Sequence, residues 1–415
     1  MQYLNKAFLI AGATLVGLSA SGEILDRASG IKIGQRMTLR PYVSMTVGYD
    51  SNVEASGVNA KGGDALWTIS PALSLSYKGE RSALLLSGHY NYRTYSQTSY
   101  TTYNGHSFGE DLRWNWSNVD RGEKGWSLIL MENFQQFNSS DDMVTADGQN
   151  YSGDTRQFHA SGVLQRQFSE HWHADVNASY SLLDYLNDTQ KRYAYYGWDR
   201  WQVGAEAGFA PSKWTDILLS AGYMGYNQDN MDGSRYDGSS DGFSLQGGLA
   251  SYMTERISYR VLAGWSRFNY ADTGDSTDGF VYTVSGNWKI GESWNTMLLA
   301  SSYYQPSERQ QATKSRVDAI SWGLAKMLVR GKLRATFDIR YRHETNEYVL
   351  DTANDLDYAL DIVTGRFGLD YSFNRFLSIF GYAEYQRSFN DEADRHHGAY
   401  DYDRWRVTGG FRLSY

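Results

Sequence analysis

Apolar and polar residues alternate one by one along much of this chain, and the pattern is clearest at its end. One face of the last stretch reads Trp405, Val407, Gly409, Phe411, Leu413 and Tyr415. The other face reads Arg404, Arg406, Thr408, Gly410, Arg412 and Ser414. Successive side chains of a β-strand point to opposite faces, so the alternation predicts a strand with one apolar and one polar face.

The same rhythm returns in windows of strand length from Met37 onward. We therefore expect about 18 strands, an even number, in these windows: Pro41–Asp50, Ala65–Lys78, Ser82–Tyr95, His106–Trp116, Trp126–Phe137, Thr155–Phe168, Trp172–Tyr185, Trp198–Phe209, Trp214–Tyr226, Gly242–Tyr252, Ile257–Tyr270, Gly279–Ile290, Trp294–Gln305, Ser315–Leu328, Lys332–Thr345, Asp357–Phe373, Phe376–Phe389 and Tyr402–Tyr415.

So many apolar strand faces must be kept away from water, and the chain has too few helical stretches to cover them. Lipid on the outside of a closed barrel satisfies both the apolar faces and the backbone hydrogen bonds. The predicted fold class is all-β, a transmembrane antiparallel up-and-down β-barrel. The alternative is a soluble propeller or solenoid, but such folds usually show a strict internal motif, and only a hydropathy rhythm occurs here.

The connections between the windows alternate between short and long. Short ones include Lys78-Gly79-Glu80, Gly291-Glu292-Ser293 and Arg330-Gly331, whereas Ser51–Asp64 and Asn390–Asp401 are long. Short periplasmic turns and long extracellular loops are typical of outer-membrane barrels. Trp126, Trp172, Trp214 and Trp294 follow short turns, where an aromatic belt would meet the periplasmic interface.

The composition agrees with a barrel. Aromatic residues make up 15% of the 415 residues, with 33 Tyr and 13 Trp, yet the mean hydropathy is only -0.55. A polar lumen combined with aromatic rims gives this balance. The net charge of -8 excludes a generally cationic nucleic-acid surface, and the lack of cysteine suits passage through an oxidising periplasm.

The beginning of the chain predicts export. Lys6 precedes the apolar run Ala7 to Leu18, and Ala20-Ser21-Gly22 supplies small residues before a cleavage point. We expect residues 1–22 to form a signal peptide, residues 23–36 a short periplasmic segment and residues 37–415 the barrel. The alternative, an uncleaved anchor helix, would need a longer apolar run.

Charged residues on the polar faces are the candidate lumen lining. They mix both signs: Arg93, Arg113, Arg260, Arg334, Arg340, Arg366, Arg404, Arg406, Arg412, Asp111, Asp175, Glu206, Asp338, Asp370 and Glu384. Such groups set the selectivity of a water-filled channel, although many pairs would simply neutralise each other across neighbouring strands. The last strand, together with Arg334, Arg340 and Arg342, suggests an electropositive strip for anionic solutes, but the sequence does not make these two groups adjacent.

Catalytic and metal sites have weaker support. His396 and His397 lie among acidic residues in the last long loop, where a rim enzyme would place its groups, but any acidic loop with two histidines looks the same. The stretch Asn227–Gly242 resembles a calcium loop with its Asp-Gly one position out of register. No hydrolase, phosphate-loop or zinc-protease motif occurs, so we expect no enzyme, no metal and no cofactor.

Two segments carry a family resemblance. Arg40-Pro41-Tyr42-Val43-Ser44, leading to Gly48-Tyr49-Asp50-Ser51-Asn52, resembles the opening of the putative β-barrel porin-2 family. Trp67–Tyr77, with its central Pro71, is similar to the Ser- and Leu-rich strand that follows in that family. Asp50-Ser51 replaces the commoner Asp-Asp. The closing Phe411, Leu413 and Tyr415 resembles the signal read by the outer-membrane assembly machinery.

The resemblance implies an outer-membrane barrel of undefined substrate, and some relatives are associated with exopolysaccharide export. The sequence as a whole predicts a passive outer-membrane channel for polar or anionic solutes. Alternatives are a polysaccharide export pore, a rim-located enzyme and a closed structural barrel. The expected partners are outer-membrane lipid and lipopolysaccharide, the assembly machinery, and small polar solutes or polysaccharide, with no nucleic acid.

Overall fold

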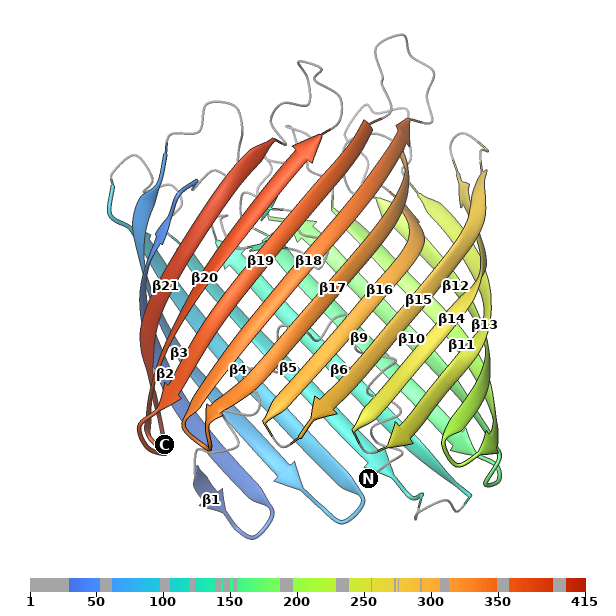
Figure 1. Ribbon diagram of the computed structural model, residues 1–415, viewed down its shortest axis with the longest axis horizontal. Helices are drawn as coiled ribbons and strands as arrows, with labels where there is room; N and C mark the ends of the chain where they lie inside the picture. The colour runs from blue at the N-terminus through green and yellow to red at the C-terminus, as the bar shows by residue number, and fades with distance from the viewer. Residues whose placement is uncertain are drawn as a thin grey trace.

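The computed structural model describes residues 30–52, 62–97, 105–119, 124–138, 143–144, 150–151, 155–186, 197–228, 239–254, 256–271, 274, 276–291, 293–306, 313–348, 358–390 and 401–415. These residues form one large barrel of tilted antiparallel strands (Figure 1). Among the described residues there is no helix that is long and apolar enough to cross a membrane.

Eighteen long strands make up the barrel wall. They are β2 (Met37–Asp50), β3 (Asp64–Lys78), β4 (Ser82–Tyr95), β5 (Gly105–Ser117), β6 (Gly125–Asn138), β9 (Thr155–Gln167), β10 (Trp172–Tyr185), β11 (Trp198–Ser212), β12 (Thr215–Gln228), β13 (Ser240–Thr254), β14 (Ile257–Tyr270), β15 (Ser276–Ile290), β16 (Trp294–Pro306), β17 (Thr313–Val329), β18 (Leu333–Tyr348), β19 (Tyr358–Ser372), β20 (Leu377–Asn390) and β21 (Tyr402–Ser414).

Each wall strand pairs with its neighbours in the sequence, and the two ends of the sheet meet. The first wall strand, β2, pairs with β3 on one edge and with β21 on the other, with Tyr42 opposite Ser414 and Asp50 opposite Arg406. This pairing leaves no open edge in the wall, as a spanning β structure requires. The predicted fold class, a closed antiparallel barrel of about 18 strands, is confirmed.

Three short strands lie outside this wall pattern. β1 (Ile31–Ile33) pairs with the start of β2, and β7 (Met143–Val144) pairs with β8 (Asn150–Tyr151). The sequence windows do not include them, because two or three residues are too few to show alternation. β1 falls within the segment 23–36 that we expect to be periplasmic.

The short turns gather at one end of the barrel, where the chain also ends at Tyr415 (Figure 1). In the turn between β17 and β18, Lys332 N–H donates to the carbonyl of Val329 at 2.9 Å. Gly331 in this turn has φ +72°, a conformation that side chains disfavour, so glycine permits the tight reversal. The end with short turns corresponds to the periplasmic side in outer-membrane barrels.

The outer surface is an apolar band with aromatic residues near both ends. Large apolar side chains such as Leu219, Phe280 and Val407 lie more than half exposed on outward positions. Near the short-turn end, cations lie over three of the tryptophans in the predicted belt: Arg166 over Trp126, Lys213 over Trp214 and Lys326 over Trp294, at 4.6, 4.7 and 4.0 Å. Such pairs suit an interface that is apolar on one side and wet on the other.

The inner surface is less uniform than the alternation predicts. Leu218, Ala250 and Leu262 form a buried apolar cluster across β12, β13 and β14, and Leu183 packs with Phe137 and Trp198. A side chain that points inward must fit its neighbours but need not be polar or charged. The inner face is therefore less uniformly polar than the lipid face is apolar.

Candidate functional site

Five neighbouring strands, β18 to β21 and β2, present an inner face rich in arginine. The relevant positions alternate with exposed apolar residues of the same strands, such as Ile339, Phe367 and Val407. We call this face the arginine wall, and it carries eight arginines and five carboxylates: Arg40, Arg334, Arg340, Arg342, Arg366, Arg404, Arg406 and Arg412, with Asp50, Asp338, Glu344, Asp370 and Glu384.

A row of alternating charge crosses the arginine wall. Asp338, Arg366, Glu384, Arg406 and Asp50 stand directly opposite one another on β18, β19, β20, β21 and β2 in turn. Cross-strand neighbours of opposite charge stabilise each other. These five residues therefore fit the neutralising interpretation better than that of an unpaired selectivity ring.

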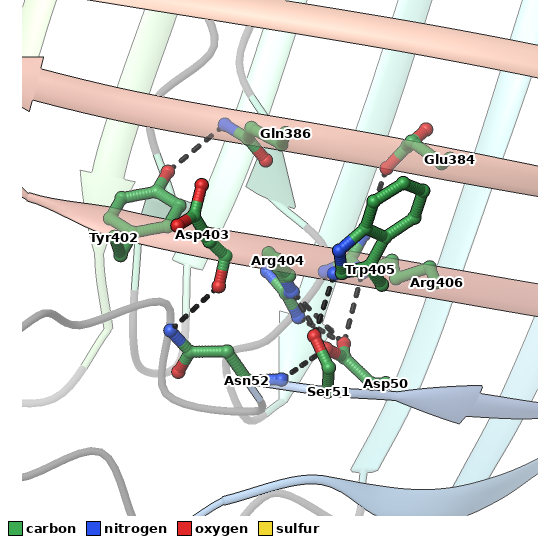
Figure 2. Close-up of polar contacts among 10 residues, drawn as sticks. All are labelled: Asp50, Ser51, Asn52, Glu384, Gln386, Tyr402, Asp403, Arg404, Trp405 and Arg406. Atoms are coloured by element: carbon green, nitrogen blue, oxygen red, sulfur yellow. Dashed lines mark hydrogen bonds and ion pairs between the residues drawn. The ribbon is translucent and has the colours of Figure 1, made fainter.

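The row ends in a buried ion pair at the seam of the barrel. The Arg404 Nε donates to both carboxylate oxygens of Asp50, at 2.9 and 3.0 Å (Figure 2). Each of these two side chains is only 1% exposed. Arg406 Nε donates to Asp50 Oδ2 at 3.0 Å, and Arg406 Nη1 lies 3.8 Å from Glu384 Oε1. One carboxylate thus holds two guanidinium groups at the junction of the first and last wall strands.

Neighbouring polar groups fix the end of the seam. Asn52 N–H donates to Asp50 Oδ1 at 3.1 Å, and Asn52 Nδ2 donates to the carbonyl of Asp403 at 3.3 Å (Figure 2). The backbone N–H of Trp405 donates to Ser51 Oγ at 2.7 Å. The residues after β2 are therefore tied to β21 by side-chain contacts as well as by the strand ladder.

The arginines of the wall differ in their access to solvent. Arg342 is 9% exposed and donates to the buried Glu344 at 2.8 Å. In contrast, Arg340 is 50% exposed although its Nε donates to Asp338 at 2.8 Å. Arg366 is also exposed, with its guanidinium 4.3 Å from the ring centre of Tyr382. Arg340 and Arg366 are therefore the arginines of this wall whose charged groups are open to solvent.

A second charged cluster lies on the facing part of the barrel. Asp175 on β10 stands opposite Glu206 on β11. Arg260 of β14 reaches past β12 and β13 to Glu206, with Nη1 donating to Oε1 at 2.9 Å and Nη2 paired with Oε2. Two acids thus share one arginine on this side, so the cluster carries no excess of positive charge.

The remaining lumen candidates lie on inner positions of β4, β5, β18, β19 and β21. Asp111 accepts hydrogen bonds from Asn133 and Ser87, at 2.5 and 3.4 Å. The remaining placements are Arg93 on β4, Arg113 beside Asn115, Arg334 opposite Asp370, and Arg412 with its guanidinium 5.3 Å from the ring centre of Phe380. All 15 predicted lumen residues thus fall on the inner face, and their part in conduction stays a prediction.

Two features of this site were not predicted from the sequence. Asp50 is the carboxylate around which the seam is built, and its inward position in a predicted strand beside the predicted seam was the available signal. The groups around Arg334 and Arg404, which the sequence did not make adjacent, lie on one wall because β19 and β20 are all that separates β18 from β21.

The predicted assembly residues line the outer face of β21. Phe411, Leu413 and Tyr415 are all exposed there. Tyr415 N–H donates to the carbonyl of Pro41, and its own carbonyl accepts from Gly30 N–H, both at 3.1 Å. The last residue is therefore built into the seam, while recognition by the assembly machinery stays a prediction.

Other predicted features lie outside the described residues. His396, His397, most of the stretch resembling a calcium loop and the expected signal peptide belong to this part of the chain. Within the described residues, no group of three or more His, Asp or Glu side chains is arranged to hold a metal ion.

Comparison with known families supports the barrel assignment. Residues 27–121 match the model of the family described as "Putative beta-barrel porin 2". This is the family that the segments from Arg40 to Asn52 and from Trp67 to Tyr77 resemble, so the match confirms that resemblance. No sequence among curated proteins matches the chain.

Three of the solved structures to which this chain shows similarity are the following. A BenF-like porin from Pseudomonas fluorescens Pf-5 is 12% identical with a TM-score of 0.44, over 91% of this chain and 98% of that one. The siderophore receptor PirA from Pseudomonas aeruginosa is 10% identical with a TM-score of 0.43, over 93% and 81%. The FrpB iron transporter from Neisseria meningitidis, in its apoprotein form, is 10% identical with a TM-score of 0.46, over 94% and 83%.

The family match and the closed barrel with its apolar outer band lead to one conclusion. The chain is a porin-like β-barrel of the bacterial outer membrane.

Proposed function

We propose that this outer-membrane barrel is a passive channel for polar solutes that favours anions. Solutes would diffuse through the lumen along the arginine wall, without energy input and without covalent chemistry. The arginine wall is the single observation that carries the anion preference, because its eight arginines outnumber its five carboxylates.

The preference follows from the excess of arginine on the wall and from which of these arginines are exposed. The buried pairs of Arg404 with Asp50 and of Arg342 with Glu344 largely cancel at a distance. Arg340 and Arg366 remain exposed on the same wall. Charges along a passage with low-dielectric walls raise the local concentration of counter-ions, so these two residues would attract anions.

A test of this proposal measures anion entry into proteoliposomes. Vesicles holding a halide-sensitive dye receive iodide, with valinomycin and potassium to balance charge. The double variant Arg340→Gln/Arg366→Gln should slow iodide entry about 2- to 10-fold, because removing two exposed charges weakens local anion enrichment. The variant Arg387→Gln is the matched control, since Arg387 is an exposed arginine on the outer face of β20.

Iodide entry at the wild-type rate in the double variant would contradict the role of Arg340 and Arg366. No iodide entry through the wild-type barrel, above that of empty vesicles, would contradict the channel itself.

A polysaccharide exit pore is the second candidate, and one observation favours it. Arg366 lies over the ring of Tyr382, and Arg412 over that of Phe380, on the inner face of β19 to β21. Aromatic faces and guanidinium groups in a row suit sugar rings that carry carboxylates. Polymer passage predicts that an anionic polysaccharide transiently blocks conductance, whereas a neutral dextran of equal size blocks less.

A further inference from the structure

A group of polar side chains lies on the outer, lipid-facing surface near the end of β18 that carries the long loops. The outward positions of β18 read Phe337, Ile339 and Tyr341, all exposed, and then His343 and Thr345. Tyr341 belongs to the aromatic zone where a barrel meets lipid headgroups. His343 and Thr345 follow Tyr341 toward the long loops and therefore lie on the headgroup side of that zone.

Three of these side chains form a hydrogen-bonded relay. Thr345 Oγ1 lies 3.3 Å from His343 Nε2, and His343 Nδ1 lies 2.9 Å from Asp361 Oδ1. The carboxylate acceptor fixes the proton of His343 on Nδ1, which leaves Nε2 as the acceptor for the Thr345 hydroxyl. A hydroxyl, an imidazole and a carboxylate in this order form the arrangement of a base-activated nucleophile.

The strand geometry explains why these groups meet. His343 and Thr345 are two residues apart on β18, so they share one face. Asp361 stands directly opposite His343 on β19. Tyr341 Oη also donates to Asp361 Oδ1, at 2.6 Å, and the carboxylate is only 10% exposed. Asp361 is thus held in place by a second donor, as an orienting carboxylate would need to be.

The strand on the other side supplies a cation. Arg316 on β17 stands directly opposite Thr345, and Asp318 stands opposite His343. Arg316 Nε donates to Asp318 Oδ2 at 3.2 Å, which uses one of the five N–H donors of the guanidinium. Directly opposed side chains begin about 5 Å apart. The Arg316 guanidinium lies 6.0 Å from the ring centre of Tyr304 on β16, so it must turn toward β18 to reach an oxygen bound at Thr345.

We propose that this group is a hydrolytic site for carboxylic acyl esters of membrane lipids. Thr345 is the nucleophile, His343 the general base and Asp361 the positioning residue. Arg316 stabilises the negative charge that develops on the ester carbonyl oxygen. The activity is separate from conduction, because every residue involved lies on the outer face of the barrel.

The reaction needs only the ester and water. Thr345 Oγ1 bonds to the ester carbonyl carbon while its proton passes to His343 Nε2. The bond from that carbon to the alcohol oxygen then breaks, and the alcohol leaves with the proton from His343. A water molecule, deprotonated by the same imidazole, attacks the acyl-threonine, which releases the fatty acid and restores the hydroxyl.

The first test measures ester cleavage by the purified full-length barrel in detergent micelles, with para-nitrophenyl palmitate as the probe. Thr345→Val should lower the rate on the order of 100-fold or more, because the nucleophile is lost. Thr345→Ser should retain activity. Thr94→Val is the matched control, since Thr94 is an outward threonine at the same end of β4 that donates only to a backbone carbonyl.

Two histidine variants and one aspartate variant separate catalysis from structure. His343→Gln should abolish cleavage, whereas His159→Gln should not, because His159 bonds Ser181 on the inner face. Asp361→Asn should lower kcat with little change in KM, since Asp361 acts through His343. A merely structural network would change stability in these variants without any cleavage to lose.

The natural source of the ester is distinguished by two further substrates. Fatty-acid release from a diacyl phospholipid alone, or from lipid A alone, supports the proposal and identifies the source. Release from neither, or a Thr345→Val rate equal to that of the wild type, overturns it. A fluorophosphonate probe on the wild-type protein gives an answer that does not depend on any variant folding: an adduct on Thr345 supports the proposal, and its absence contradicts it.

Discussion

Asp50 is surrounded by two guanidinium groups at a place where water is almost excluded. Arg404 and Asp50 are each 1% exposed, and Arg406 adds a second contact to the same carboxylate. Removing one partner of such a pair leaves an uncompensated buried charge, which costs far more than the net value of the intact pair. At the residue scale, the charges of the wall thus divide into buried groups that fix the seam and exposed groups that the proposed channel would use on solutes.

This division predicts that a single substitution costs more stability than a matched double substitution. Asp50→Asn should lower the free energy of unfolding by about 3–5 kcal/mol, because Arg404 loses its counter-charge. The double variant Asp50→Leu/Arg404→Met should cost clearly less, since the fully buried Arg404 is removed as well and the remaining Arg406 is 16% exposed with Glu384 3.8 Å away. Urea unfolding of the barrel in detergent, followed by the electrophoretic shift between folded and unfolded forms, measures both. Equal destabilisation by the single and double variants would contradict a buried ion pair at the seam.

At the element scale, β1 continues the line of the last strand. β21 pairs with β2 from Ser414 to Arg406, and β1 pairs with β2 at Met37 to Leu39. Gly30 N–H donates to the carbonyl of Tyr415 at the junction. Gly30 has φ +61°, and a Cβ there would lie 2.5 Å from Thr38 Cγ2, so only glycine fits this close approach. Two segments from opposite ends of the chain therefore cover one edge of β2.

Deleting Tyr415 tests the role of this junction. The deletion removes the N–H bonded to Pro41, the carbonyl bonded to Gly30 and the ring packed 6.0 Å from Phe376. We expect a marked fall in the fraction of barrel that reaches the outer membrane in its folded, heat-modifiable form. Tyr415→Phe keeps the aromatic end and should assemble normally. Normal assembly after the deletion would count against a terminal assembly signal.

At the scale of the whole molecule, the two-residue alternation of apolar and polar residues predicted most of the wall strands. The expected windows Ser82–Tyr95, Trp172–Tyr185 and Ile257–Tyr270 coincide with β4, β10 and β14. In a barrel each strand meets lipid on one side, so apolar residues must recur at every second position. β1 was not predicted, because three residues are too few to show the alternation.

The polar contacts of the site were harder to predict from the sequence. Asp50 and Arg404 are 354 positions apart, and alternation gives the face of each residue but not the register between the first and last strands. His343 and Thr345 carry no sequence motif, because their partner Asp361 comes from the next strand across a long connection. Only the pairing of β18 with β19 brings the three together.

The whole barrel has one arginine-rich wall, and the charged cluster on the facing side, with Asp175, Glu206 and Arg260, has no excess of arginine. The arginine wall spans β18 to β21 and β2, whereas the inner faces of β6, β9, β13, β16 and β17 carry no Lys, Arg, Asp or Glu among the described residues. A field across the lumen follows from this asymmetry, and it would act on every ion that passes.

The reversal potential of the wild-type barrel in a planar bilayer, under a gradient of potassium chloride, tests this account most directly. An excess of exposed arginine predicts discrete conductance steps whose current reverses toward the equilibrium potential of chloride. A bilayer that stays silent with folded protein present, or a current that reverses toward the equilibrium potential of potassium, would contradict it.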